Sequence, residues 1–320
     1  MPQPETNKQQ KYKDNMDFEI LINNTFSDIN SDDTITPTAH KSVVSMINNF
    51  EDTEWRYNHF QNFIWDNIAE TSLSHKERES LVNNHHSLLT YAAKNLRLSD
   101  KTGDISKGSE IAEIVLYAIM KHHFNALPVV PKIFYKQNAQ DNAKGADSVH
   151  IIIENGNDFS IWFGEAKFYN SIEDARIAEI ITSVENSLST EKLKKENSII
   201  TNVSDIDQLI LDEPLRNAIK AALSTRESID LIKPKLHIPI LLLHECEITQ
   251  RQNAISDEYK SELIQYHKNR AESFFKKQIN KLGTLPHYSE IKFHLILFPV
   301  PLKKTIVDSF VSIADFYKNS

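Results

Sequence analysis

Residues 147–167 read D-S-V-H-I-I-I-E-N-G-N-D-F-S-I-W-F-G-E-A-K, and this stretch decides the fold that the sequence predicts. Two runs of β-branched and aromatic residues flank the polar link Asn155-Gly156-Asn157, a pattern typical of a β-hairpin. Because side chains on a strand alternate between its two faces, residues two positions apart share a face. A three-residue link opposes odd-numbered residues to odd-numbered ones, so the hairpin is predicted to have one apolar face.

Three charged residues fall on that apolar face. Glu165 and Lys167 continue the odd-numbered face of the second strand, and Asp147 begins the same face of the first strand. The register places Asp147 across from Glu165 or Lys167. Charged groups at the end of a buried face cost stability unless they pair with one another or bind a ligand. We therefore expect a functional cluster, although a bare D-x(n)-E-x-K match is by itself common.

Two carboxylates and a lysine indicate a particular chemistry. Carboxylate oxygens suit a hard divalent cation such as Mg²⁺, with Mn²⁺ as the alternative. A bound divalent ion lowers the pKa of a water ligand and stabilises charge on a scissile phosphate. Lys167 would orient that water or help to deprotonate it. The pattern therefore predicts metal-dependent phosphodiester hydrolysis.

A helix is predicted shortly before the hairpin. Apolar residues recur at three- and four-residue spacing between positions 111 and 119, which marks one buried stripe. The first turn of this helix carries Glu110 and Glu113, and either is a candidate for a further carboxylate in the site.

The rest of the chain divides into three expected regions. Residues 1–40 are polar and predict a flexible leader that contributes little to stability. Residues 41–100 predict a helical region, and residues 101–320 an α/β domain with C-terminal additions. Strands and helices alternate through this last region, which predicts a mixed β-sheet flanked by helices. The expected elements include a strand at 132–135, one helix from about 171 to 195, strands at 236–244 and 292–298, and helices at 257–282 and 302–317.

Composition excludes several classes of protein. Only six glycines occur, and neither G-x-G-x-x-G nor G-x-x-x-x-G-K-[ST] is present, which argues against a glycine-rich nucleotide site. The single cysteine, Cys246, excludes an internal disulfide and suits a reducing compartment. No apolar run approaches the ~20 residues of a membrane span, and the polar N-terminus does not resemble a signal peptide. A cytoplasmic protein without a membrane partner is predicted.

The formal net charge of −8 bears on any nucleic-acid partner, because affinity for DNA comes largely from lysine and arginine. Either the cations are clustered or a partner protein holds the DNA. The alternative interpretation of each candidate cluster is a solvated helix face. The clusters are Lys192, Lys194 and Lys195, and then Lys268, Arg270, Lys276, Lys277 and Lys281.

Three blocks of sequence resemble the HamA family, the nuclease subunits of the Hachiman anti-phage defence system. The blocks are K-G-S-E-I-A-E-I-V-L-Y (Lys107 to Tyr117), K-G-A-D-S-V-H (Lys144 to His150) and W-F-G-E-A-K-F-Y (Trp162 to Tyr169). They cover about a quarter of the chain. The resemblance implies a restriction-endonuclease-like PD-(D/E)xK fold, DNA as substrate, a divalent metal and a superfamily 2 helicase partner, HamB.

The resemblance also implies roles for individual residues. Asp147 and Glu165 match the metal ligands of the family, and Lys167 matches its catalytic lysine. The helical acid falls on Glu113, with Glu110 as the alternative, because the spacing from Gly108 is one residue longer than in the family. The predicted function is a DNA nuclease that acts with a helicase in anti-phage defence. The alternatives are a stand-alone restriction or repair nuclease and a non-catalytic interaction module on the same fold.

Overall fold

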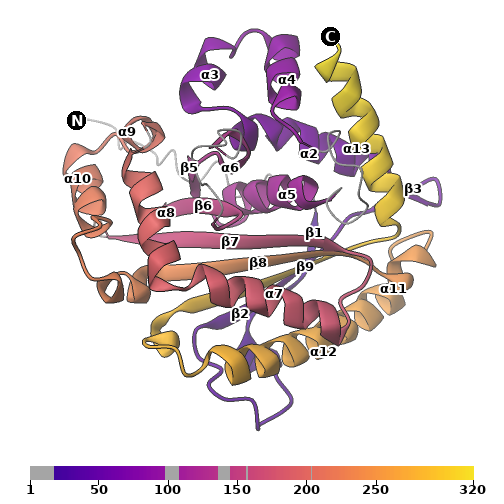
Figure 1. The fold of residues 1–320 in the computed structure, drawn as a ribbon. Helices are drawn as coiled ribbons and strands as arrows, with labels where there is room; N and C mark the ends of the chain where they lie inside the picture. Colours follow the sequence, from indigo (N-terminus) through magenta and orange to yellow (C-terminus); the bar gives the residue numbers. More distant parts are fainter. Residues whose placement is uncertain (1–17, 98–107, 136–144, 156–157, 203) are drawn as a thin grey trace, which may run out of the picture.

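The computed structural model describes residues 18–97, 108–135, 145–155, 158–202 and 204–320. Its centre is a seven-stranded sheet (Figure 1). From one edge to the other, the strands are β1 (Glu19–Thr25), β2 (Lys41–Ile47), β9 (Lys292–Val300), β8 (Leu236–Glu245), β7 (Phe159–Tyr169), β6 (Ser148–Ile153) and β5 (Leu127–Val130). The sheet and its flanking helices confirm the predicted α/β class.

Strand directions decide where a site can form. The four central strands β2, β9, β8 and β7 run parallel, whereas β1, β6 and β5 pair antiparallel with their neighbours. The carboxyl ends of the parallel strands therefore share one edge with the beginning of β6. Ligands of open α/β sheets bind at the carboxyl ends of the strands.

Helices cover both faces of the sheet (Figure 1). Apolar side chains of one helical set form a core with one face of the sheet; these helices are α2 (Tyr57–Ser72), α4 (His85–Lys94), α5 (Ser109–His122) and α13 (Lys303–Lys318). A second core lies on the other face, under α7 (Asp174–Ser187), α8 (Thr190–Asn202), α10 (Glu213–Ala222) and α12 (Asp257–Leu282). The shorter elements are α1 (Phe26–Ile29), β3 (Phe50–Glu51), β4 (Glu54–Trp55), α3 (His75–Ser80), α6 (Lys132–Tyr135), α9 (Asp205–Leu209) and α11 (Glu247–Gln250).

Strand β7 separates the two cores as its alternation predicts. Ile161 and Phe163 belong to the core under α7, whereas Trp162 and Phe168 belong to the core under α5. Val149 pairs with Phe163 across the hairpin, so odd-numbered residues oppose odd-numbered ones. The predicted register is confirmed, although residues 156–157 of the expected turn lie outside the described part of the chain.

The prediction of a loose leader over residues 1–40 is wrong from Phe18 onward. Residues 19–25 form edge strand β1, and Ile22 and Phe26 are buried at 3% and 0% exposure. The sequence of β1 lacks a clear alternation of apolar and polar residues, because the strand is mostly exposed and its register shifts between Ile20 and Ile22. The region predicted to be helical also contributes to the sheet, through β2, in addition to helices α2, α3 and α4.

Two further expected elements differ in the structure. The strand expected at 132–135 is the single helical turn α6, and the strand lies earlier, at β5. A short apolar run does not by itself distinguish a strand from a helix, and Pro128 in β5 is compatible with its place at the sheet edge. The helix expected over 171–195 is interrupted near Ser189, whose carbonyl and hydroxyl oxygens accept the first hydrogen bonds of α8. Among the described segments, no helix combines the length and the apolar sequence needed to cross a membrane.

Candidate active site

The backbone of the hairpin fixes Asp147 beside the end of β7. Ser148 pairs with Gly164, and the Asp147 amide donates a hydrogen bond of 2.8 Å to the Gly164 carbonyl. The Ala166 amide in turn donates to Asp147 Oδ2 at 3.1 Å. The side chain of Asp147 therefore lies next to the segment that carries Glu165 and Lys167.

The structure brings these three predicted residues together. Lys167 Nζ lies 3.2 Å from Asp147 Oδ2 and 3.5 Å from Glu165 Oε2. The hydroxyl of Ser183, on α7, donates a hydrogen bond of 2.9 Å to Glu165 Oε2. Two carboxylates thus share one ammonium group, and a helix on the same face of the sheet orients one of them.

Gly164 allows the strand to pass close to its neighbours just before Glu165. A Cβ atom at this position would lie 2.2 Å from Ser148 Oγ and 2.7 Å from Leu116 Cδ2. Any larger residue would push β6 or α5 away from β7. The glycine of the G-E-A-K motif therefore has a packing role at the site.

Burial and the close charges shift the pKa values of Glu165 and Lys167. Glu165 is 4% exposed, and both this desolvation and the charge of Asp147 raise its pKa from 4.5 to about 7, against the opposite effects of Lys167 and Ser183. Burial lowers the pKa of Lys167, but the two carboxylates outweigh it and hold that pKa above its ordinary value. Lys167 is therefore a cation. The nearby Asp147 carboxylate makes Glu165 easier to protonate.

The donor set fits a hard divalent cation. Asp147 and Glu165 offer carboxylate oxygens, and Mg²⁺ is commonly held by one or two carboxylates together with waters and substrate phosphates. No group of three or more His, Cys, Asp or Glu side chains is arranged for metal binding within the described ranges. The two carboxylates are thus the part of the predicted metal site that the structure assembles.

The two helical acids differ in their surroundings. Both carboxylate oxygens of Glu110 accept a hydrogen bond from the Arg97 amide, at 3.1 and 3.0 Å, so Glu110 holds the chain that follows α4. Glu113 is buried on α5, at 4% exposure. Burial raises the pKa of Tyr117, one turn further along, and the charges of Glu113 and Glu196 raise it further. Glu113 stays the prediction for the helical acid, with Glu110 as the alternative.

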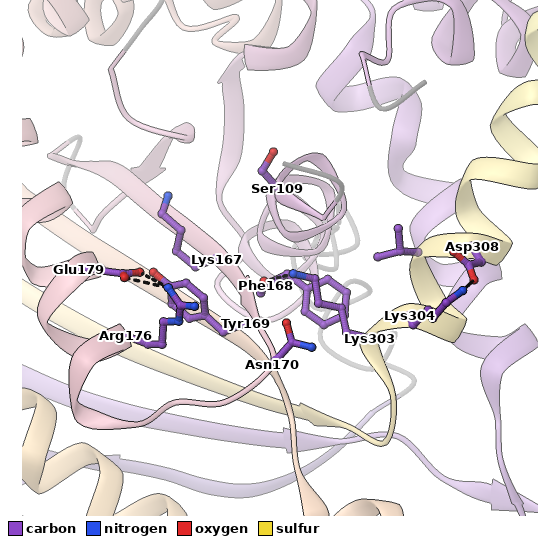
Figure 2. Close-up of a pocket in the computed structure, with 11 residues that line it drawn as sticks. Ser109, Lys167, Phe168, Tyr169, Asn170, Arg176, Glu179, Lys303, Lys304 and Asp308 are labelled. Carbon is purple, nitrogen blue, oxygen red and sulfur yellow. Dashed lines mark hydrogen bonds and ion pairs between the residues drawn. The ribbon is translucent and has the colours of Figure 1, made fainter. Parts of the chain in front are cut away.

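A cleft of about 730 Å³ opens beside Lys167 at the carboxyl end of β7 (Figure 2). It reaches from α7 on one side to α13 on the other. The side chains that line it are those of Ser109, Lys167, Phe168, Tyr169, Asn170, Arg176, Glu179, Lys303, Lys304, Val307 and Asp308. Of the three predicted residues, Lys167 lines this cleft, and its ammonium contacts Asp147 and Glu165.

A family model described as HamA matches residues 22–314. The chain belongs to the HamA family. A search of curated proteins gave no match. Family membership implies a role in Hachiman anti-phage defence, in a system that includes a partner.

The HamA match extends far beyond the three sequence blocks. It begins within β1 and ends within α13, so it includes part of β1, every other strand of the main sheet and both walls of the cleft. The resemblance expected from the blocks around residues 107–169 is therefore confirmed over most of the chain.

The cationic residues of the cleft are the part of this HamA site that the sequence did not indicate. Arg176, Lys303 and Lys304 belong to two segments far apart in the chain. The sequence feature that they share is their position, since each follows closely after the carboxyl end of a central strand, β7 or β9. In the candidate cluster on α12, four of the five cations, all except Lys268, pair with acids in the described structure. Three of these pairs are Lys276–Asp32, Lys277–Asp174 and Lys281–Glu185, at 3.0, 3.1 and 3.1 Å.

Proposed function

We propose that this HamA-family chain is a metal-dependent DNA nuclease with a PD-(D/E)xK active site. The observation that carries the proposal is the convergence of Asp147, Glu165 and Lys167 at the carboxyl edge of the sheet, beside an open cationic cleft. Buried charges are costly unless they are paired or functional. A site of this composition suits phosphodiester hydrolysis.

Each residue has a distinct proposed role. Asp147 and Glu165 would hold Mg²⁺ or Mn²⁺, and Ser183 would keep the Glu165 carboxylate oriented through its 2.9 Å hydrogen bond. The metal would supply a water of lowered pKa and stabilise negative charge on the phosphate. Lys167, whose ammonium already lies between the carboxylates, would orient the attacking water. Glu113 is the proposed helical acid.

A helicase partner accounts for the charge of the protein. At a formal net charge of −8, the lone chain is expected to bind DNA weakly at physiological salt. A superfamily 2 helicase of the HamB type has its own nucleic-acid channel and would raise the local concentration of DNA at a tethered nuclease. We therefore propose that the complex cuts DNA efficiently and that the lone subunit cuts it poorly.

Cleavage by the purified complex tests the proposal. We expect cleavage of DNA with Mg²⁺ or Mn²⁺, none with a chelator, and a loss of cleavage in Asp147→Asn. Asp158→Asn is the matched control, because Asp158 also pairs with a lysine, Lys235, but at the exposed hairpin. Cleavage that persists in chelator, or in Asp147→Asn, would exclude this active site.

The same assay separates the alternatives. Equal, sequence-specific cutting by the lone chain would indicate a stand-alone restriction or repair nuclease. A complex that forms but never cuts DNA with any divalent ion would indicate a non-catalytic interaction module.

A further inference from the structure

The cleft beside Lys167 crosses the end of β7 from one layer of helices to the other. Figure 2 shows Arg176 and Glu179 of α7 on one side of the strand, and Lys303, Lys304 and Asp308 of α13 on the opposite side. Lys167 lies on the α7 side, above Arg176 in this view, and Lys303 lies across the strand from it. The cleft is therefore a track across the sheet edge that passes the proposed catalytic lysine.

The track is cationic although the whole protein is anionic. Four cationic side chains line it, namely Lys167, Arg176, Lys303 and Lys304, against the two carboxylates of Glu179 and Asp308. Each carboxylate already binds a cation of the same wall. Arg176 contacts Glu179 at 2.8 Å, and Lys304 contacts Asp308 on the next turn of α13. Among the described residues that line the cleft, four cations face two carboxylates, and Lys167 also contacts Asp147 and Glu165.

Lys303 is held in place before any ligand binds. Its Nζ donates a hydrogen bond of 2.8 Å to the Phe168 carbonyl and lies 5.3 Å from the centre of the Phe168 ring, within the range of a cation–π contact. Its backbone amide donates to Glu245 Oε1 at 2.8 Å. A cation fixed at both ends loses little further freedom when it binds a phosphate.

The cleft also has an aromatic wall suited to a base. Tyr169 shares the strand face of Glu165 and Lys167 and lines the cavity. The Arg176 guanidinium lies 5.6 Å from the centre of its ring. Cations along a backbone track combined with an aromatic surface are the features by which proteins bind single-stranded nucleic acid.

We infer that this cleft binds one unpaired strand of DNA across the end of β7, with phosphates on both sides of the scissile one. The inference rests on the proposed nuclease function, in which Lys167 marks the scissile phosphate. Arg176 binds a phosphate on the α7 side, and Lys303 and Lys304 bind phosphates on the α13 side. A volume of about 730 Å³ lies within the range of small-ligand pockets and encloses a few nucleotides of one strand rather than a duplex.

Binding of an oligonucleotide to the full-length chain, in chelator so that no cleavage occurs, tests this inference. The probe is a fluorescent single-stranded DNA of about twelve nucleotides, within the range that single-strand sites occupy. The variant is Arg176→Gln with Lys304→Gln, because both side chains are more than half exposed, at 51% and 85%, and their loss leaves the core intact. Lys276→Gln, in an exposed ion pair on α12, is the matched control.

Counterion release fixes the expected result. Each lost contact with a single-strand phosphate lowers the slope of log K against log salt by about 0.7, which is roughly a fivefold loss of affinity at 0.1 M salt. The double variant should therefore bind about 25-fold more weakly, with a slope smaller by about 1.4. Lys276→Gln should bind within about twofold of the wild type, since its cation is paired far from the cleft.

Three results would overturn the inference. The first is binding by the double variant that equals the wild type, and the second is a loss in Lys276→Gln as large as in the double variant. The third is equal affinity for a duplex of the same length, which would contradict an unpaired strand. Cleavage is scored separately, with Mg²⁺ restored. If the double variant binds more weakly but no cleavage is seen, the binding cleft is supported and the proposed nuclease function is excluded. If DNA is cleaved but the double variant binds as the wild type does, only the binding cleft is excluded.

Discussion

Two clusters of buried lysine and carboxylate lie next to each other in this protein, and they differ in accessibility. In the first, Lys132 Nζ contacts Glu196 Oε2 at 2.6 Å, and the two side chains are 0% and 3% exposed. In the second, Asp147 and Glu165 share Lys167, which is 30% exposed and lines the cleft. A buried glutamate is common to both clusters. The difference lies in access and in the number of carboxylates around one ammonium.

The first cluster is built as a closed structural pair. Glu196 uses its second oxygen, Oε1, to accept a hydrogen bond of 3.0 Å from the Ala146 amide, directly before Asp147. A buried carboxylate bound on both oxygens holds the chain that leads into β6. The Lys132–Glu196 pair, called the closed pair below, therefore positions the backbone of the open cluster, which is Asp147, Glu165 and Lys167. This supports a structural role for the closed pair and a chemical role for the open cluster.

Lys132→Met tests the closed pair and should give the largest effect. It leaves the Glu196 carboxylate buried beside one amide donor, and removing one partner of a buried ion pair costs about 3–5 kcal/mol. Unfolding in urea measures the loss. The double variant Lys132→Met with Glu196→Gln should recover most of it, because neither position of the pair then carries a charge. A loss below about 1 kcal/mol in the single variant would contradict a structural pair.

Gly145→Ala should have the next largest effect, by displacing Glu196. An added Cβ would lie 1.6 Å from Glu196 Oε1, so the carboxylate has to move away from the Ala146 amide. We expect a loss of about 2 kcal/mol, in the range of overpacked cores. An unchanged urea midpoint would show that Glu196 is not fixed there.

His150 extends the comparison to a buried group without charge. It is 0% exposed on β6 beside the Tyr117 ring, with no hydrogen-bond partner for either ring nitrogen in the described structure, and burial lowers its pKa from 6.5 to about 3. In the unfolded chain His150 binds a proton near pH 6.5, whereas in the folded protein the buried ring stays neutral at that pH. Stability is therefore complete above pH 6.5 and falls on acidification by about 1.4 kcal/mol per pH unit for this group. In His150→Phe, the slope of stability against pH between 6.5 and 5 should fall by one proton, and an unchanged slope would be evidence against the buried neutral ring.

Glu165→Gln should give the smallest change in stability, and with the opposite sign. The substitution removes a carboxylate that desolvation and Asp147 both disfavour, so stability at pH 8 should rise by about 1 kcal/mol, as is common when a functional site is neutralised. Thermal unfolding of Glu165→Gln beside Lys132→Met measures both signs in one experiment. If Glu165→Gln lost several kcal/mol in the free energy of unfolding, the open cluster would be shown to stabilise the fold, as the closed pair does.

The contrast also explains what the sequence predicted and what it did not. Asp147, Glu165 and Lys167 were predicted because one hairpin carries all three, and strand parity is a local property. The lining by Arg176, Lys303 and Lys304 depends on helices that follow different strands, so only the tertiary fold brings it together. Strand β1 was missed for a related reason, since pairing with β2 rather than its own composition stabilises it.

Cleavage by Glu165→Gln in the helicase complex, measured on the same preparation as its stability, tests the central claim most directly. We predict a protein at least as stable as the wild type whose cleavage of DNA with Mg²⁺ falls by more than about a hundredfold, since even outer partners of metal ligands contribute 10–100-fold. A folded Glu165→Gln complex that cuts DNA at the wild-type rate would contradict the assignment of this cluster as the active site.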